Sequence, residues 1–179
     1  MSYKKINLLV VDDDEVDRIA IKRAIKSSGF NADLHFGDTY DEGMEKALSM
    51  EFDVLIVDYY LAAMNAGDFI SEYSQRGGTA PIIVVSSQGE EKIVVELMKA
   101  GACDYIPKAV LTPESIARAL KGALKSKANK NNHSNIETAL VQTERTLNAV
   151  VSKSPLILFS INESGIFTLF KGMAMDTIR

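Results

Sequence analysis

Hydrophobic residues in the first 125 positions follow two alternating patterns. Short, continuous apolar runs are typical of buried strands, and each is followed by a segment with apolar residues three and four positions apart, as on one face of a helix. The predicted strands span residues 5–11, 32–36, 52–57, 81–85 and 103–106. The predicted helices span residues 16–26, 39–50, 67–75, 90–99 and 112–125.

The first and fifth of these helices carry additional signals. In the first helix, an apolar face is expected to pack against the neighbouring strands. Its residues are Val16, Ile19, Ala20, Ala24 and Ile25. The fifth helix has an N-terminal signature, with Thr112 at the N-cap, Pro113 at the first helical position and Glu114 in the first turn.

Strands that are apolar throughout predict a sheet that is buried on both faces. This is the situation of a parallel sheet with helices on either side, so the predicted fold class is α/β. Right-handed crossovers leave few arrangements, of which a five-stranded doubly wound sheet of order 2-1-3-4-5 is favoured. In such a sheet, ligands bind at the carboxyl ends of the strands, near the switch between strands 1 and 3.

Residues 126–179 follow a different pattern. Residues 126–133 are polar and lack periodicity, so they are predicted to be a linker or a frayed helix end. Beyond them, apolar residues and one threonine have the 4-3-4-3 spacing of a heptad repeat over about two heptads. They are Ile136, Leu140, Thr143, Leu147 and Val150. A coiled coil and an amphipathic helix that packs on its own chain both agree with this spacing.

The end of the sequence predicts a β-hairpin. Residues 155–161 and 166–170 are strand-like, and Asn-Glu-Ser-Gly lies between them. An isolated hairpin is marginal in water, so the start of a larger domain is expected here. The predicted organisation is a domain at residues 1–125, a linker helix at 126–153 and a domain fragment at 154–179.

Composition narrows the class of protein. Hydrophobic residues make up 46% and charged residues 25%, as in soluble globular proteins. Cys103 is the single cysteine, which excludes an internal disulfide and fits a reducing cytosol. The apolar runs are far shorter than the ~20 residues of a membrane helix. A cytoplasmic protein without membrane contact is therefore expected.

Charge is distributed unevenly along the chain. Residues 1–125 contain 14 Lys/Arg and 20 Asp/Glu, a net charge of -6. Residues 126–179 contain 6 and 4, a net charge of +2, which brings the total to -4. An acidic first domain argues against nucleic acid as its ligand, and the positive charge of the remainder is too small to favour it.

Polar side chains follow four of the five predicted strands. Because the carboxyl ends of neighbouring parallel strands meet at one edge of the sheet, these side chains are expected to converge. They are Asp12, Asp13 and Asp14 after strand 1, Asp58 after strand 3, Ser86 and Ser87 after strand 4, and Lys108 after strand 5.

This combination favours phosphoryl transfer to a carboxylate. Close carboxylates repel each other by about 4 kcal/mol per pair at an effective dielectric of 20, so a cation such as Mg²⁺ is expected among them. Asp58 could accept a phosphoryl group, because carboxylates form aspartyl-phosphates. Mg²⁺, the Lys108 ammonium and the Ser86 hydroxyl would then face its three oxygens. A bare phosphate site is not expected, because carboxylates stand where a Gly-rich loop would be needed.

The same segments resemble the receiver domains of bacterial response regulators over about residues 4–125. The matching segments are Val-Val-Asp12-Asp13, Leu-Ile-Val-Asp58, Val-Val-Ser86-Ser87 and Asp-Tyr105-Ile-Pro-Lys108. The resemblance implies a flavodoxin-like sheet. It also implies that Asp58 accepts a phosphoryl group from a sensor histidine kinase or a phosphotransfer protein.

The resemblance assigns a role to each residue of the site. Asp12, Asp13, Asp58 and the backbone carbonyl of Tyr60 would bind Mg²⁺. Lys108 would be the partner of the phosphate, Ser86 the switch hydroxyl and Tyr105 the switch aromatic. Beyond its own phosphoryl transfer and hydrolysis, the chain is not expected to be an enzyme.

Three positions depart from the pattern of this family. Ala109 follows Lys108 where the family usually has proline, which argues against the usual cis bond. Ala62 stands where proline is frequent, so a looser loop is expected after Asp58. Tyr60 places a large ring two residues after the acceptor, where it would slow the access of water and lengthen the life of the phosphoryl group.

The predicted hairpin is similar to the opening hairpin of PAS sensor domains, although only about 25 residues are present and a complete PAS fold would need chain beyond Arg179. The helix before it would then be a signalling linker. Three other candidates have simpler explanations: His133 belongs to the linker, and His35 and Cys103 are predicted to be structural.

Two other functions compete with phosphorelay signalling. A pseudo-receiver could act as an interaction scaffold without phosphorylation, and Mg²⁺ binding would separate the two. An Asp-nucleophile phosphatase would need a second aspartate where Tyr60 stands. For a working receiver, the switch is expected to act through residues 90–125, which could form a homodimer together with the helix at 136–150.

Overall fold

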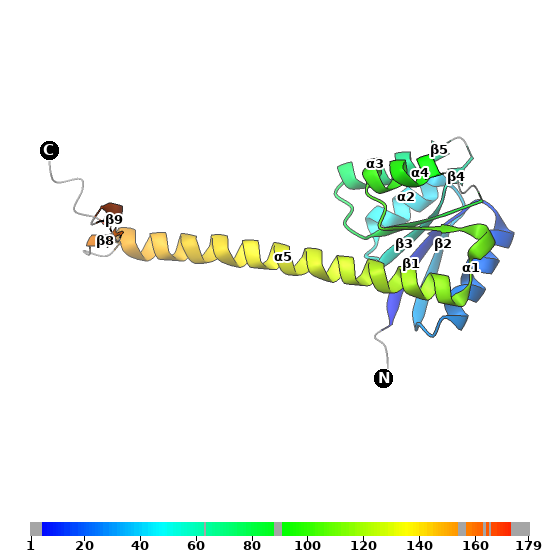
Figure 1. The fold of residues 1–179 in the computed structure, drawn as a ribbon, viewed down its shortest axis with the longest axis horizontal. Helices are drawn as coiled ribbons and strands as arrows, with labels where there is room; N and C mark the ends of the chain where they lie inside the picture. Colours follow the sequence, from blue (N-terminus) through cyan, green and yellow to red (C-terminus); the bar gives the residue numbers. More distant parts are fainter. Residues whose placement is uncertain are drawn as a thin grey trace. The chain divides into compact units, whose positions relative to one another are not determined.

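The structure is a computed structural model that describes residues 5–62, 64–87, 91–153, 157–162, 164 and 166–172. Its helices are α1 (Glu15–Ser27), α2 (Tyr40–Ser49), α3 (Ala66–Gln75), α4 (Glu91–Ala100) and α5 (Pro113–Lys153), with a 3₁₀ turn η1 (Lys108–Val110). Its strands are β1 (Ile6–Val11), β2 (Ala32–Gly37), β3 (Val54–Asp58), β4 (Tyr60–Leu61), β5 (Met64–Asn65), β6 (Ile82–Ser86), β7 (Asp104–Pro107), β8 (Ile157–Ile161) and β9 (Phe167–Gly172). Figure 1 labels most of them along the chain.

Five of these strands form one parallel sheet in the order β2-β1-β3-β6-β7. The register is continuous across its centre, where Val10 pairs with Ile56 and Val57 with Val84. When these five strands are numbered by their order along the chain, their order in the sheet is the predicted 2-1-3-4-5. The predicted α/β fold class and doubly wound topology are therefore confirmed.

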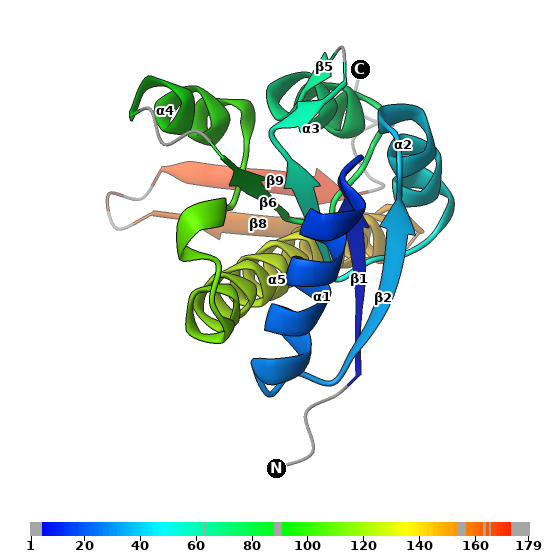
Figure 2. The same cartoon turned by 90° about the vertical axis from the view of Figure 1, so that its right-hand side faces the viewer.

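Helices cover both faces of the sheet, and the sheet separates the core into two halves (Figure 2). Successive residues of a strand point to opposite faces, so each apolar strand contributes to both halves. On one face α2, α3 and α4 pack against alternate strand residues, with Phe69 fully buried at the centre. On the other face α1 and the first turns of α5 do the same, with Ile116 and Leu120 fully buried.

The buried face of α1 differs from the predicted one. Its buried residues are Ile21, Ala24 and Ile25. Val16 and Ile19, which were expected to pack against the sheet, are 71% and 42% exposed, and Ala20, also expected there, is exposed as well. A buried stripe that includes Ile21 extends back four residues along the helix to position 17 and not to position 16, because residues four apart share a face. The predicted stripe was therefore rotated by one position at its N-terminal end.

Helix α5 joins two segments that were predicted as separate helices, residues 112–125 and 126–153. It begins as expected, with Thr112 and Ser115 in a reciprocal cap: the Ser115 N–H donates to Thr112 Oγ1 at 3.2 Å and the Thr112 N–H to Ser115 Oγ at 2.9 Å. The helix then continues through residues 126–133 to Lys153, so the non-helical linker or frayed end considered for residues 126–133 is not observed, whereas the helix predicted over residues 126–153 is. That stretch contains no glycine or proline, and polar residues alone do not end a helix.

The chain divides into two compact units, Met1–Asn129 and Lys130–Arg179. In the second unit, β8 and β9 form the predicted antiparallel hairpin, with Phe159 paired to Phe170. Most side chains of the heptad positions in α5 lie outside the described residues, so the two alternatives for that segment stay predictions. Among the helices that are described, none combines the length and the apolar character that a membrane span requires.

Candidate functional site

Three buried polar side chains lie at the carboxyl edge of the parallel sheet. In the described part of the chain, the buried polar or charged residues are Asp12, Asp58 and Ser86, which are 0%, 6% and 0% exposed. Asp12 directly follows β1, Asp58 ends β3 and Ser86 ends β6. Burying polar groups is costly unless they are partnered, so their concentration at one edge indicates a site for chemistry rather than for packing.

Lys108 brings a positive charge to this edge from the end of β7. Its Nζ lies 2.7 Å from Asp58 Oδ1, 3.2 Å from Asp12 Oδ2 and 2.5 Å from Asp17 Oδ2. An ammonium group has three N–H donors, so these three carboxylates occupy all of them. The Lys108 side chain is only 16% exposed, and its contacts are correspondingly little screened by water.

Backbone N–H groups hold the opposite oxygens of the two buried carboxylates. The Asp14 N–H donates to Asp12 Oδ1 at 2.9 Å, and the Tyr60 N–H donates to Asp58 Oδ2 at 3.0 Å. Both carboxylates therefore have one oxygen directed to the ammonium and the other to a turn. This arrangement fixes the plane of each carboxylate at the end of its strand.

The chemistry of the carboxylates fits a magnesium ion. Asp12, Asp13 and Asp58 each place a carboxylate oxygen within 4.8 Å of the other two. Asp12 and Asp58 are buried, whereas Asp13 is exposed. Mg²⁺ prefers hard oxygen ligands and keeps several of its waters, which a half-open set of this kind allows.

The electrostatics of the site point to the same conclusion. Burial raises the pKa of Asp12 to about 6; the Asp14 N–H and Lys108 oppose this shift, and the charge of Asp58 adds to it. Burial also raises the pKa of Asp58 above its ordinary value, although Lys108 opposes it. Burial would lower the pKa of Lys108, but hydrogen bonds to Asp17 and Asp58 raise it above its ordinary value. The buried carboxylates thus lack positive charge, which a divalent cation would supply.

Comparison with known proteins identifies the family. Residues 8–121 match the response regulator receiver domain family, which is more than half of the chain. The chain belongs to this family. The resemblance to receiver domains that was found in the sequence is thereby confirmed.

Relatives of this receiver domain include both short and long proteins. The chemotaxis protein CheY of Thermotoga maritima is 32% identical over 115 residues, which are 63% of this chain and 92% of that protein. A cyclic di-GMP phosphodiesterase of the same organism is 32% identical over 107 residues, which are 59% of this chain but only 27% of that protein. The chain thus spans only about a quarter of this longer relative.

Solved structures agree on the fold. The CheY-like receiver domain of Methanospirillum hungatei JF-1 superposes with a TM-score of 0.60 at 22% identity, covering 71% of this chain and 99% of that chain. At this identity the likeness concerns the fold alone. It places the receiver fold over the part of the chain that carries the acidic edge.

The remaining predicted residues lie on or beside the same edge of the receiver. Ser86 pairs in register with Pro107, and Tyr105 lies two residues earlier on β7, half-buried against the core. Tyr60 is 48% exposed, and its ring stands edge-on to the ring of Tyr59 at 4.7 Å between centroids. The structure thus brings Asp12, Asp13, Asp58 and Lys108 into one cluster, with Ser86 on the adjoining strand end.

Asp17 is the residue of this cluster that was not predicted. Its carboxylate contacts Lys108 from α1, although it lies in none of the motifs that carry the family resemblance. A signal was present in the sequence: Asp17, Ile21, Ala24 and Ile25 have the i, i+4, i+7, i+8 spacing of one helix face. A carboxylate in the inward stripe at the first turn of a helix that follows β1 points to a role at the carboxyl edge.

The residues with predicted structural roles behave as expected. His35 packs its ring edge-on against Phe52, with centroids 5.3 Å apart, and Cys103 is half-buried against the core. The side chain of His133 lies outside the described residues. None of the peptide bonds described is cis, including the one between Lys108 and Ala109.

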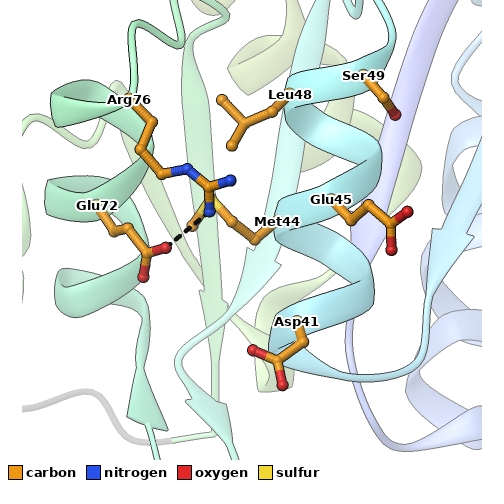
Figure 3. A pocket seen from close by; sticks show the side chains of 7 residues that line it. All are labelled: Asp41, Met44, Glu45, Leu48, Ser49, Glu72 and Arg76. Carbon is orange, nitrogen blue, oxygen red and sulfur yellow. Dashed lines mark hydrogen bonds and ion pairs between the residues drawn. The ribbon is translucent and has the colours of Figure 1, made fainter.

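A separate depression of about 440 Å³ lies between α2 and α3 (Figure 3). It is lined by Asp41, Met44, Glu45, Leu48, Ser49, Glu72 and Arg76. Within it, the Arg76 guanidinium pairs with Glu72 at 2.9 Å, and the Tyr40 hydroxyl donates to the second Glu72 oxygen at 2.8 Å. It shares no residue with the acidic edge, so it does not belong to the site described above.

Proposed function

We propose that this receiver domain acts in phosphorelay signalling and that Asp58 accepts a phosphoryl group from a sensor histidine kinase or a phosphotransfer protein. The observation that carries the proposal is the position of the Asp58 carboxylate. It is buried at the end of β3, with Lys108 Nζ at 2.7 Å from one oxygen and the Tyr60 N–H at 3.0 Å from the other. In a receiver family, a carboxylate held in this way is the natural acceptor.

The transfer from a phosphohistidine donor is a single displacement at phosphorus. A carboxylate oxygen of Asp58 forms the new P–O bond while the P–N bond of the donor breaks. The bonding pair stays on the imidazole nitrogen, which takes up a proton. The phosphoryl group spreads its charge over three equatorial oxygens, so the acceptor needs positive and donor groups around it.

Residues around Asp58 meet these needs. Asp12, Asp13, Asp58 and the Tyr60 carbonyl would hold Mg²⁺, which when bound supplies positive charge to a phosphoryl oxygen. The Lys108 ammonium moves from the carboxylate oxygen to a second phosphoryl oxygen, and the Ser86 hydroxyl donates to the third. Withdrawal of Ser86 toward the phosphate leaves space for Tyr105 to change rotamer, and this biases a two-state rearrangement of the domain.

The switch is proposed to act on other parts of the molecule through one face of the receiver domain and through the helix that follows it. Residues 90–125 form the readout face, and together with the helix at 136–150 they are the proposed homodimer surface. The hairpin at β8 and β9 is proposed to open a PAS-like domain that the switch controls. A cytoplasmic site of action fits a kinase partner. Light scattering tests the dimer, since phosphorylation is expected to raise the mass, and an unchanged monomer in both states would contradict it.

The lifetime of the phosphoryl group is proposed to depend on Tyr60. Its ring is half-exposed beside the acceptor and is held edge-on by Tyr59. Replacing Tyr60 with asparagine removes the ring and opens a path for water to the phosphorus. Tyr60→Asn is expected to accelerate loss of the phosphoryl group several-fold, as measured by its decay after the donor is removed; an unchanged decay would contradict this role.

Intact-mass spectrometry after incubation with acetyl phosphate and Mg²⁺ tests the proposed function. One added phosphoryl group is expected in the wild type and none in Asp58→Ala or in a sample with the metal chelated. Asp53→Ala is a matched control, because Asp53 is a carboxylate at the opposite end of the same strand, and it should be phosphorylated like the wild type. A folded wild type that gains no phosphoryl group would favour the scaffold without phosphorylation.

A further inference from the structure

Lys108 has two kinds of carboxylate partner. Asp12 and Asp58 belong to the set whose oxygens converge within 4.8 Å, and that set is the one suited to a divalent cation. Asp17 contacts the same ammonium at 2.5 Å but is not part of the converging set. Lys108 therefore shares two partners with the metal and has one partner of its own.

Asp17 occupies a place from which it can act on Lys108 alone. It lies in the first turn of α1, on the face that continues into Ile21, Ala24 and Ile25. Its side chain is 31% exposed, whereas that of Lys108 is 16% exposed. It thus approaches the ammonium from the helix side, while Asp12 and Asp58 approach from the strand ends.

A bound cation and Lys108 compete for the same oxygens. If the carboxylates of Asp12 and Asp58 held a divalent ion, their attraction for the ammonium would weaken, and the charge of the ion would repel the ammonium. Two effects thus act together to drive Lys108 away from Asp58. The Asp17 carboxylate opposes both, because its charge is not shared with the metal.

We propose that Asp17 is a positioning residue that keeps the Lys108 ammonium beside Asp58 when a divalent cation occupies the acidic edge. The inference rests on the proposed function, since Lys108 is the group that meets the phosphoryl oxygen. Without Asp17, the cation and Lys108 exclude each other from the site. With it, both positive groups are present when the phosphoryl group arrives.

Nuclear magnetic resonance of the lysine side chains tests this without any phosphorylation. In protein labelled at lysine, the Lys108 ammonium is followed while Mg²⁺ alone is added to the full chain. The wild-type signal should keep the chemical shift and slow proton exchange of a paired ammonium, whereas in Asp17→Asn it should move with Mg²⁺ toward those of an exposed lysine. A Lys108 signal that stays in place in Asp17→Asn at saturating Mg²⁺ would overturn the inference.

A double-mutant cycle separates positioning from a general charge effect. With acetyl phosphate and saturating Mg²⁺, Asp17→Asn is expected to slow phosphorylation of Asp58 roughly tenfold, the scale of one lost charge-assisted hydrogen bond. In a Lys108→Met background, the same substitution should change the rate less than twofold. A tenfold slowing in both backgrounds would overturn the inference, because Asp17 would then act without Lys108.

Asp38→Asn is the matched charge control. Asp38 is also a carboxylate near this edge, with 61% of its side chain exposed and a 3.5 Å pair to Arg18, but it makes no ion pair with Lys108. It should leave both the Lys108 signal and the rate at wild-type values. If the wild type is not phosphorylated at all, the proposed function fails, while the resonance experiment still decides the role of Asp17.

Discussion

An aspartate–lysine pair lies at each end of strand β3, and the two pairs share their residue types and nearly share their length but differ in burial and in the charges around them. At the amino end, Lys127 Nζ lies 2.8 Å from Asp53 Oδ1, and at the carboxyl end Lys108 Nζ lies 2.7 Å from Asp58 Oδ1. The first pair is partly exposed, at 30% for the aspartate and 26% for the lysine. The second is buried, at 8% and 16%.

At the amino end, the described contacts balance one negative and one positive charge. Lys127 Nζ also donates to the Phe52 carbonyl at 2.8 Å, and Asp53 Oδ2 accepts from the Asn7 N–H at 2.9 Å. The pair thereby ties α5 to β1 and β3. An ion pair of this kind, completed by backbone groups, contributes to stability and has no excess charge that a ligand would neutralise.

At the carboxyl end, the charges do not balance. Lys108 faces the carboxylates of Asp12, Asp17 and Asp58, and Asp13 adds a fourth nearby. A surplus of buried like charges opposes folding, and burial itself raises the pKa values of Asp12 and Asp58 above their ordinary values. The comparison teaches that distance and residue type do not distinguish a structural ion pair from a functional one, whereas the neighbouring charges do.

The largest effect is expected from removing the ammonium at the carboxyl end of β3. Lys108→Met should lower the free energy of unfolding by about 4 kcal/mol at pH 7, because it leaves buried carboxylates without a counter-charge. Mg²⁺ should restore much of this loss by neutralising the same carboxylates. Urea unfolding with and without Mg²⁺ measures both, and a loss below 1 kcal/mol or no response to Mg²⁺ would remove the contrast between the two pairs.

The second prediction concerns pH. The pKa of Asp12 is raised by burial to about 6 in the folded protein, against an unfolded value of 3.8. The folded state therefore binds a proton at the Asp12 carboxyl more tightly than the unfolded state does. The stability that this proton contributes is full below pH 3.8 and is lost as the pH rises through about 6. For a shift of this size the loss is about 3 kcal/mol.

Asp12→Asn isolates this contribution. Without metal, the unfolding free energy of the variant relative to the wild type should rise by about 2.4 kcal/mol between pH 4 and pH 7, because part of the full loss has already occurred at pH 4. The difference between the two proteins cancels the titration of all groups that they share. An Asp53→Asn variant should show no comparable rise. Equal pH profiles for the wild type and Asp12→Asn would show that folding does not raise the pKa of Asp12.

Most of the fold could be predicted because its signals are local. Continuous apolar runs end at charged residues such as Asp12 and Asp58, and the observed strands lie within two residues of the predicted ones. The strand order followed from the handedness of crossovers. The short β4–β5 hairpin and the uninterrupted passage of α5 through residues 126–133 were not predicted, because neither stretch has an apolar period of its own and neither is marked by glycine or proline.

The sequence could predict the site residues that stand at the ends of strands, but not the site residue that lies on a helix. Asp12, Asp13, Asp58 and Lys108 converge because each stands at the end of a parallel strand. Asp17 lies on a helix, and its position depends on how α1 is rotated about its axis. Val16 and Ile19 misled that assignment, because apolar residues on an exposed face have the same spacing as residues on a buried one.

A smaller effect is expected from Lys127. Lys127→Met should lower the free energy of unfolding by about 1 kcal/mol, because the pair is partly exposed and its charges are screened by water. Neither Mg²⁺ nor a change from pH 5 to pH 7 should alter this loss. Lys121→Met is the control, since Lys121 lies on the exposed face of the same helix. A loss as large as that of Lys108→Met would mean that the carboxylates at both ends of β3 depend equally on their lysine partner for stability.

The smallest effect concerns the turn that follows the carboxyl end. Ala62 lies between β4 and β5 with a φ of 54°, a left-handed conformation that is unfavourable for residues with a Cβ. Ala62→Gly removes this cost but adds freedom to the unfolded chain, so a net gain of about 0.5 kcal/mol is expected. Ala62→Pro should instead destabilise the protein, because proline holds φ near -65°. Thermal unfolding of the two variants measures the contrast, and a stabilising proline would show that the loop after Asp58 adopts an ordinary turn. Since the Tyr60 N–H that holds Asp58 belongs to this hairpin, such an outcome would also weaken the case that the acceptor carboxylate is fixed before the phosphoryl group arrives.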